Sequence, residues 1–229
     1  MYALATSRRS CQVTCEALFE ATGAKFLVVK TKDQLTAEWL SQHGVTKIFL
    51  PHWSYRIPTA VYQAFETIIF HMTDLPFGRG GSPLQNLIVR GHESTAITAL
   101  RCVEDLDAGP VYLKRPLSLN GSAEEIFLRA DRIIHSMIID IIRDAPEPRP
   151  QQGEPTVFKR RRPEDGDWSQ ATDLDTVFNY IRMLDAAGYP LAFIDVGPFR
   201  LDFSRASRKT DAVLADVRIS IRDTGESEK

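Results

Sequence analysis

Cysteine is scarce in this chain of 229 residues, which holds Cys11, Cys15 and Cys102 and no Cys-x-x-Cys pair. An odd count without paired spacing excludes a disulfide framework and is typical of reduced thiols in a cytoplasmic protein. On a helix, Cys11 and Cys15 would lie one turn apart and could share a metal ion. We favour the alternative that they are small, buried apolar side chains, and we predict no metal site.

Long apolar runs are also missing. The most apolar stretch, residues 133–142, is interrupted by His135, Ser136 and Asp140 and falls short of the roughly 20 apolar residues that a membrane span needs. Arg8 and Arg9 follow the first apolar residues, which reverses the order of a secretory signal. We therefore expect a cytoplasmic protein without a membrane partner.

Excess positive charge is absent as well. The formal net charge is −2, whereas a surface that neutralises many phosphates is usually strongly basic. This balance predicts that nucleic acid is not a partner and leaves a small anionic ligand open.

The first half of the chain alternates two kinds of pattern. Strand-like runs, rich in β-branched and aromatic residues, occupy residues 2–6, 26–29, 47–50 and 67–70, with helix-like runs at 11–21, 35–43 and 58–65. Such alternation predicts an α/β fold with a mostly parallel sheet. Ligands of such sheets bind beyond the carboxyl ends of the strands, which draws attention to the residues after 50 and 70.

A strand pair and a long helix follow this alternating region. Residues 93–103 and 111–117 read as two strands joined by a turn, and Ser122 with Glu125 forms a capping box before an amphipathic helix. The segment 145–155 then holds four prolines and a glycine, so we predict an extended linker instead of a packed element.

The linker divides the predicted domains. We expect a catalytic domain over residues 1–150 and a small α+β subdomain over residues 151–229. In the subdomain, Thr172 or Asp173 caps a predicted helix, and strands follow at 192–196, 199–203 and 212–221. The polar end at 223–229 is predicted to be frayed.

The residues that carry chemistry lie around His71 and Asp107. His71 ends a buried strand, and a glycine-rich loop with Arg79 leads from it to a helix start that can hold an anion or a carbonyl oxygen. Asp107 occupies a tight turn between two strands. A histidine oriented by a carboxylate stabilises developing charge and relays protons. The alternative is structural, because aspartate before Ala-Gly is a common turn former.

Two motifs resemble the formyltransferase family. Residues 71–85 follow its signature His-x-Ser-x-Leu-Pro-x-x-Arg-Gly-x-x-Pro-x-Gln, with Thr73 at the serine position, and residues 96–109 are similar to its segment that ends in Leu-Asp-Thr-Gly. Residues 161–166, Trp168 and 189–193 look most like the nucleotide-sugar N-formyltransferases. The resemblance implies a Rossmann-like domain and N10-formyltetrahydrofolate as the formyl donor.

The resemblance also implies a reaction. We expect a sugar N-formyltransferase that formylates the amine of a nucleotide-linked amino sugar in surface-glycan or nonulosonic-acid biosynthesis. The chain could form a homodimer. His71 would stabilise the negative oxygen, and Asp107 would hold His71 and relay the proton. The alternatives are a methionyl-tRNA formyltransferase-like enzyme and a non-catalytic folate- or sugar-binding regulator.

One departure from the family pattern concerns Ile69, which stands where the family has an asparagine. Losing one donor to a developing oxyanion costs about 10²–10³ in rate, so another group should substitute. We favour His52 as a third catalytic residue over the other candidates, Ser54, Thr73 and Asp74.

The remaining site residues fall into two predicted groups. The donor-binding residues are Trp53, Ser54, Tyr55, Ile57, Arg79, Gly80, Leu106 and Gly109. The acceptor-binding residues are Lys159, Arg161, Trp168 and Tyr189. For the aromatic members the alternative is a place in the core, and for the basic run a solvated face.

Overall fold

The computed structural model describes residues 1–222, which form two compact units built from interleaved segments. The first unit comprises Met1–Pro83, Ser94–Ser118 and Phe127–Lys159, and the second comprises Leu84–Glu93, Leu119–Ile126 and the chain from Arg160 onward. The contacts therefore divide the chain after Lys159, and two excursions interrupt the first unit. The end predicted to be frayed, 223–229, lies outside the described residues.

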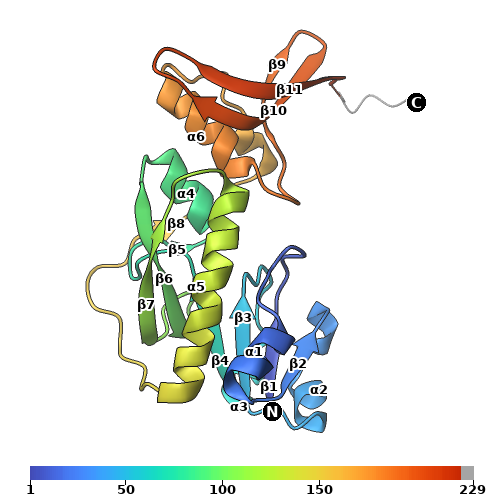
Figure 1. Ribbon diagram of the computed structural model, residues 1–229, viewed down its shortest axis with the longest axis vertical. Helices are drawn as coiled ribbons and strands as arrows, with labels where there is room; N and C mark the ends of the chain where they lie inside the picture. The colour runs from blue at the N-terminus through green and yellow to red at the C-terminus, as the bar shows by residue number, and fades with distance from the viewer. Residues whose placement is uncertain (223–229) are drawn as a thin grey trace. The chain divides into compact units, whose positions relative to one another are not determined.

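The sheet of the first unit has the strand order β2-β1-β3-β4-β6-β7 (Figure 1). Its strands are β1 (Tyr2–Ala5), β2 (Phe26–Val29), β3 (Lys47–Pro51), β4 (Glu66–His71), β6 (Ser94–Arg101) and β7 (Val111–Ser118). The four from β2 to β4 pair in parallel, and β6 and β7 pair antiparallel. The mixed but largely parallel sheet confirms the predicted fold class.

The central strands β3 and β4 form because their apolar side chains are buried on both faces. Ile48, Phe49, Leu50 and Ile68 are fully buried, as expected of a strand inside a parallel sheet. Pro51 pairs with Phe70, so both strands end at the same edge of the sheet. The residues that follow Pro51 and those that follow His71 therefore begin at one edge.

The helices of the connections are short. They are α1 (Cys15–Thr22), α2 (Ala37–Gln42), α3 (Thr59–Ala64) and α4 (Pro83–Val89), with a 3-10 turn, η1, at Lys32–Gln34. The prediction that Cys11 and Cys15 share a helix is wrong, because Thr14 caps α1 by accepting a hydrogen bond from the Ala17 amide. Cys11 therefore lies in the loop before the helix.

The long helix α5 (Ala123–Asp144) lies along one face of the sheet (Figure 1). Ser122 and Glu125 form the predicted capping box, with the Ser122 amide 2.7 Å from the Glu125 carboxylate. Ala130, Ile134 and Met137 belong to its buried stripe. Among the described residues, no helix is long and apolar enough to cross a membrane.

The proline-rich segment after α5 is extended, as predicted, but it packs against the first unit. Arg149 and Val111 exchange two backbone hydrogen bonds of 2.8 and 2.9 Å. Further on, β8 (Val157–Phe158) pairs in parallel with β5 (Arg79–Gly80). The expectation of an unpacked linker is wrong, because its backbone groups find partners on the loops and strands they pass.

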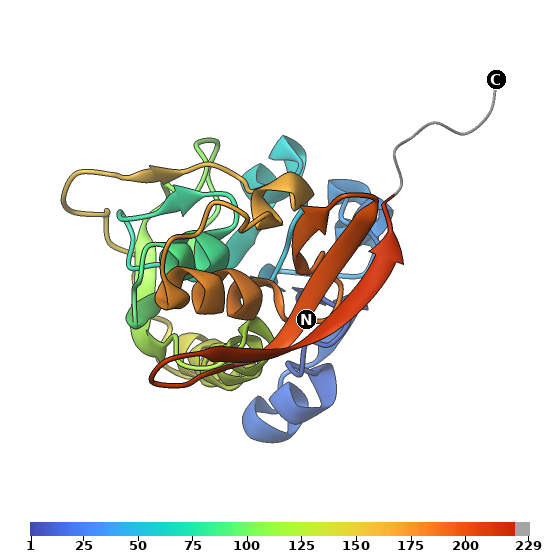
Figure 2. The ribbon, with the colours of Figure 1, turned by 90° about the horizontal axis from the view of Figure 1, so that it is seen from above.

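The second unit has the small α+β fold that the sequence predicts. Its helix α6 (Leu174–Leu184) contacts the middle strand of the antiparallel sheet β11-β10-β9 (Figure 2). The strands are β9 (Ala192–Val196), β10 (Phe199–Arg208) and β11 (Val213–Ile221), and a 3-10 turn, η2, spans Pro163–Gly166. Buried Arg182 donates hydrogen bonds to the carbonyl oxygens of Leu119 and Gly121, which give its guanidinium group acceptors inside the protein.

Candidate functional site

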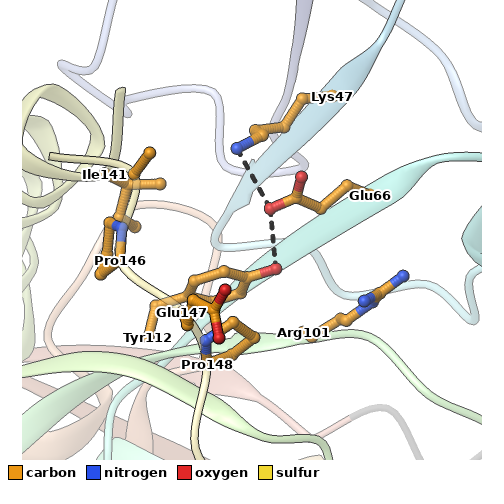
Figure 3. A pocket seen from close by; sticks show the side chains of 9 residues that line it. Lys47, Glu66, Arg101, Tyr112, Ile141, Pro146, Glu147 and Pro148 are labelled. Carbon is orange, nitrogen blue, oxygen red and sulfur yellow. Dashed lines mark hydrogen bonds and ion pairs between the residues drawn. The ribbon is translucent and has the colours of Figure 1, made fainter. Parts of the chain in front are cut away.

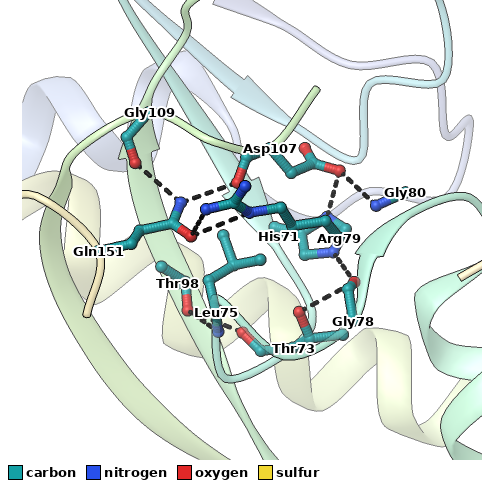
Figure 4. A network of polar contacts seen from close by, with 10 residues as sticks. All are labelled: His71, Thr73, Leu75, Gly78, Arg79, Gly80, Thr98, Asp107, Gly109 and Gln151. Carbon is teal, nitrogen blue, oxygen red and sulfur yellow. Dashed lines mark hydrogen bonds and ion pairs between the residues drawn. The ribbon is translucent and has the colours of Figure 1, made fainter. Parts of the chain in front are cut away.

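His71 is the last residue of β4, and its ring is buried beside the glycine-rich loop (Figure 4). Its Nε2 atom lies 2.8 Å from the carbonyl oxygen of Gly78. Because a carbonyl only accepts, Nε2 must carry a proton in this arrangement. The Thr73 hydroxyl also donates to the Gly78 carbonyl, at 3.3 Å. The other ring nitrogen, Nδ1, is therefore the one that remains for proton transfer.

Asp107 lies opposite His71 on the turn between β6 and β7. Its Oδ2 atom is 3.6 Å from Nδ1 of His71 and accepts a 2.9 Å hydrogen bond from the Gly80 amide. The residue has a φ of 54°, a left-handed conformation that aspartate tolerates better than most residues. The structure thus brings together the imidazole and the carboxylate that the sequence singles out, although they are 36 residues apart.

Two glycines are required by the close packing of this site. A side chain at Gly80, whose φ is 104°, would place Cβ 2.4 Å from the Phe158 carbonyl oxygen. At Gly109 the added Cβ would lie 1.7 Å from the Arg101 carbonyl oxygen. Both contacts are with backbone atoms that cannot swing aside. These two predicted donor-site positions are therefore fixed as glycine by packing, whatever they bind.

Gln151 is the residue of this network that sequence reasoning missed. Its side-chain NH₂ group donates hydrogen bonds to the carbonyls of Asp107 and Gly109, at 2.8 and 2.9 Å. Its side-chain oxygen accepts hydrogen bonds from both Nε and Nη2 of Arg79. Gln151 thereby joins the turn of Asp107 to the glycine-rich loop (Figure 4). No sequence motif marks a glutamine in a proline-rich segment as part of a site.

A second layer of contacts fixes the loop after β4. The Thr98 hydroxyl donates to the Thr73 carbonyl at 2.7 Å, and Lys114 reaches both the carboxylate of Asp74 and the Leu75 carbonyl. Of the groups considered as replacements for the family asparagine, Thr73 shares a hydrogen-bond acceptor with His71, whereas Asp74 pairs with Lys114. The structure therefore places Thr73 nearest to the chemistry of His71.

His52, the predicted third catalytic residue, is turned toward another partner. Its Nε2 atom lies 2.7 Å from Oδ1 of Asp131 on α5, and its ring packs edge-on against Phe127. Within the described residues, neither His71 nor Asp107 contacts it. The Cys11 thiol lies 3.5 Å from the same Asp131 oxygen, and the Gln12 amide donates to the other one. His52 thus belongs to a separate polar cluster.

Two pKa values in this second cluster are displaced from their ordinary ranges. Burial, followed by the charge of Asp131, raises the pKa of the Cys11 thiol to about 11. Burial acts to raise the pKa of Asp131 as well, but hydrogen bonds from His52 and Gln12 prevail and hold it below its usual value. At neutral pH the cluster therefore contains a thiol and a carboxylate.

The predicted donor loop after β3 contains both packed and exposed side chains. Trp53 and Ile57 pack against the hydrophobic core, and the Ser54 amide and hydroxyl both bond to Ser7. Tyr55 is 54% exposed, and Leu106, beside Asp107, is 70% exposed. Tyr55 and Leu106 are therefore the predicted donor contacts whose apolar surface is open to a ligand.

The predicted acceptor residues are distributed over both units. Lys159 belongs to the first unit, whereas Arg161, Trp168 and Tyr189 belong to the second. Arg161 donates to the Asp165 carbonyl and lies over the Tyr180 ring, and the Trp168 ring packs edge-on against Phe203. Trp168 accordingly has the environment of a core aromatic.

Figure 3 shows the residues that line a pocket of about 260 Å³. The pocket lies at the amino ends of β3 and β4, whereas His71 is at the carboxyl end of β4. Lys47 and Glu66, the first residues of β3 and β4, line it together with Tyr112, Glu147 and Pro148. None of the predicted site residues lines this pocket. A ligand in it would be separated from His71 by the length of β4, so we do not assign it to the reaction.

Known proteins resemble this chain over most of its length. Residues 163–220 match a family model described as the C-terminal domain of methionyl-tRNA formyltransferase. The solved methionyl-tRNA formyltransferase from Clostridium thermocellum is 43% identical, over 96% of this chain and 99% of that one, with a TM-score of 0.92. This chain belongs to the formyltransferase family. Membership confirms the predicted enzyme class and the family's formyl donor, N10-formyltetrahydrofolate.

Two proteins of lower identity show how far the match extends. A methionyl-tRNA formyltransferase from Clavibacter michiganensis is 28% identical over 155 residues, which are 65% of this chain and 50% of that protein. The chain thus spans about half the length of this relative. HypX from Aquifex aeolicus, solved with tetrahydrofolic acid, is 20% identical over 90% of this chain and 37% of its own, with a TM-score of 0.72, which shows the shared fold.

These relatives correct the predicted acceptor. A nucleotide-linked amino sugar is wrong as the acceptor, and glycan biosynthesis is wrong as the setting. The Clostridium thermocellum and Clavibacter michiganensis proteins and the matching family model all carry the name methionyl-tRNA formyltransferase. The motifs around His71 and Asp107 concern formyl transfer itself and do not identify the amine that receives the group. The exclusion of nucleic acid is overturned as well, since net charge sums the whole surface and says nothing of a local basic run.

Proposed function

We propose that this chain transfers a formyl group from N10-formyltetrahydrofolate to the amine of methionine carried by a tRNA. The observation that supports this most directly is the 43% identity to the Clostridium thermocellum methionyl-tRNA formyltransferase over nearly the whole of both chains. The meeting of His71 and Asp107 at the glycine-rich loop supports the same chemistry, because acyl transfer needs stabilisation of a negative oxygen and a route for a proton.

In this reaction the uncharged amine nitrogen attacks the formyl carbon, the bond from that carbon to N10 breaks, and the amine proton ends on N10. His71 is held by the Gly78 carbonyl with Nδ1 toward Asp107. With a proton on Nδ1, the imidazolium stabilises the developing negative oxygen while Asp107 offsets its charge. The Asp107 carboxylate accepts the proton that the amine loses, and this proton is then passed to N10 as the bond to the formyl carbon breaks.

The donor contacts that we propose are Tyr55 and Leu106, because their apolar surfaces are exposed. Arg79 and Gly80 contribute differently: they hold the loop by contacts to Gln151 and Asp107. Trp53 and Ile57 support the loop from the core side. Substituting Tyr55 by alanine should therefore raise the KM for the donor more than it lowers kcat.

The basic run Lys159–Arg162 is our candidate for contact with tRNA phosphates. The four positive charges are consecutive in the chain, so they remain together wherever the two units lie. Neutralising phosphates releases counterions and makes binding weaken with salt. Replacing Lys159 and Arg160 by alanine should weaken tRNA binding and flatten its salt dependence, whereas a pair of alanines at Lys30 and Lys32 serves as the charge-matched control.

The deciding experiment supplies purified protein with N10-formyltetrahydrofolate and methionyl-tRNA, then detects formylmethionine by mass spectrometry after hydrolysis of the ester. We expect turnover with initiator methionyl-tRNA and none with uncharged tRNA. Absence of formylmethionine from a folded protein that still binds the folate would refute the proposed acceptor. Absence of folate binding would refute the donor as well.

A further inference from the structure

The polar cluster of Cys11, His52 and Asp131 lies apart from the residues assigned to formyl transfer. A thiol, an imidazole and a carboxylate come from three distant parts of the chain: the loop before α1, the loop after β3, and α5. Their ligand atoms all lie within 4.8 Å of one another. We propose that this cluster is a binding site for one Zn²⁺ ion. This proposal does not depend on which amine accepts the formyl group.

The distances from Asp131 Oδ1 to the other two ligand atoms fit tetrahedral zinc with a small adjustment. With Zn–S near 2.3 Å and Zn–N and Zn–O near 2.0 Å, tetrahedral angles separate sulfur from oxygen by about 3.5 Å and nitrogen from oxygen by about 3.3 Å. The Cys11 sulfur is 3.5 Å from Asp131 Oδ1, and His52 Nε2 is 2.7 Å from the same oxygen. The imidazole must therefore retreat by about half an ångström as the ion enters.

The types of ligand favour zinc over the common hard cations. Mg²⁺ and Ca²⁺ prefer sets of oxygen ligands, whereas thiolate and imidazole select borderline and soft ions. Zinc binding releases the thiol proton to solvent and moves the imidazole proton that faces Asp131 from Nε2 to Nδ1, so that Nε2 offers its lone pair to the ion. The thiolate and carboxylate then carry two negative charges that balance one Zn²⁺. With three protein ligands, a water molecule would complete the tetrahedron.

Neighbouring groups hold the three ligands in place. The Gln12 amide donates to Asp131 Oδ2 at 2.9 Å, which leaves Oδ1 toward the cysteine and the histidine. The Ser7 hydroxyl donates to the His52 carbonyl, and Phe127 packs against the ring. Such outer contacts orient metal ligands in known sites. Cys11 is only partly buried, which gives the ion a path from solvent.

Zinc in this position would link the loop after β3 to α5. That loop continues from His52 into the proposed donor contact Tyr55, so the ion would restrict its motion. The bound metal should therefore raise the melting temperature of the protein, because the ion binds the folded arrangement and not the separated ligands.

The test uses the full chain, reduced and stripped of metal by a chelator, and titrated with Co²⁺ as a spectroscopic substitute for Zn²⁺. We expect one Co²⁺ per chain, with a thiolate-to-cobalt charge-transfer band that added Zn²⁺ removes. Cys11→Ala and Asp131→Asn should weaken binding by at least about 10-fold, the lower end of the loss seen even for outer contacts. Cys15→Ala is the matched control and should bind as the parent does.

Circular dichroism and thermal melting of each variant without metal keep the test independent of folding. If the folded parent protein takes up no Co²⁺ or Zn²⁺ saturably, the proposed site does not exist. Binding that Cys11→Ala leaves unchanged, or that Cys15→Ala abolishes, would equally overturn the assignment. A rise in melting temperature with Zn²⁺ in the parent and in Cys15→Ala, but not in Cys11→Ala, is the result that we expect.

Discussion

The two ends of β4 both carry charged and polar side chains, but these side chains are held in different ways. At the amino end, Glu66 accepts from Tyr112 at 2.8 Å and pairs with Lys47 at 3.1 Å, which are contacts between side chains. At the carboxyl end, His71 and Asp107 are held by backbone groups of the glycine-rich loop. The contacts between side chains stabilise the amino end of β4, whereas the contacts with the backbone fix the positions of His71 and Asp107.

The pocket and the proposed site lie at opposite ends of β4. The amino end has the pocket of about 260 Å³, and the carboxyl end has the left-handed Asp107 and two glycines that tolerate no side chain. Constrained backbone at positions that hold an imidazole and a carboxylate is the better sign of chemistry. The difference between the two ends can be tested by substitutions at each.

The largest effect is expected at the carboxyl end. His71→Ala and Asp107→Ala should each reduce the formylation rate by about 10²–10³, because each removes a group that acts on the reacting atoms. Single-turnover formylation with saturating donor measures this loss, and urea unfolding checks that the fold is retained. Either variant turning over at the rate of the parent would remove the distinction between the two ends.

A loss of stability is expected at Gly109. A Gly109→Ala substitution places Cβ 1.7 Å from the Arg101 carbonyl oxygen, and the resulting backbone shift should cost about 1–3 kcal/mol. Gly44→Ala is the control: Gly44 also lies in the first unit, but nothing lies within 4 Å of the added Cβ. Its φ of 65° still costs about 1–2 kcal/mol. Gly109→Ala should lower the free energy of unfolding more than Gly44→Ala does. A larger loss for Gly44→Ala would contradict the packing argument.

A smaller effect on the reaction is expected from Gln151. Gln151→Ala leaves the Asp107 and Gly109 carbonyls without their donor, and the turn should shift enough to slow formylation by about 10-fold, equivalent to about 1.4 kcal/mol. Gln152→Ala, at the exposed neighbouring position, is the control. We expect kcat to fall with little change in the KM for the donor. An unaltered kcat would show that the turn holds Asp107 without Gln151.

The smallest effect is expected at the amino end. Tyr112→Phe should cost about 1 kcal/mol of stability and leave formylation unchanged, since it removes one hydrogen bond. Burial and the contact with Glu66 raise the pKa of Tyr112. Stability from the neutral phenol is thus complete below its ordinary pKa near 10 and declines as the pH rises further. Above pH 10, the free energy of unfolding should fall more steeply with pH for the parent than for Tyr112→Phe. Parallel plots of this free energy against pH would refute the prediction.

The elements whose causes are local were predictable from the sequence. β-branched and aromatic runs indicated β3 and β4, and Ser122 with Glu125 marked the start of α5. His71 and Asp107 could be paired because the resemblance to a family joined two motifs. The composition of a strand or cap acts over a few residues, so its signal survives in the sequence.

Features that depend on distant contacts were not predictable. Gln151 meets Arg79 across 72 residues, and nothing in the proline-rich segment marks it. The helix-like run over residues 11–21 includes Cys11, whereas Thr14 caps α1 three residues further on. The acceptor was wrong because the motifs encode the transfer step, which a sugar amine and an aminoacyl amine share.

The position of the proline-rich segment within the first unit has a practical consequence for proteolysis. A cut after Pro150 would leave His71 and Asp107 on the amino-terminal fragment, whereas Gln151 and the β8 partner of the glycine-rich loop would depart with the other. The fragment would retain both reactive side chains and lose what aligns them. Proteolytic cleavage in the proline-rich segment should therefore abolish formylation while the first unit is still folded.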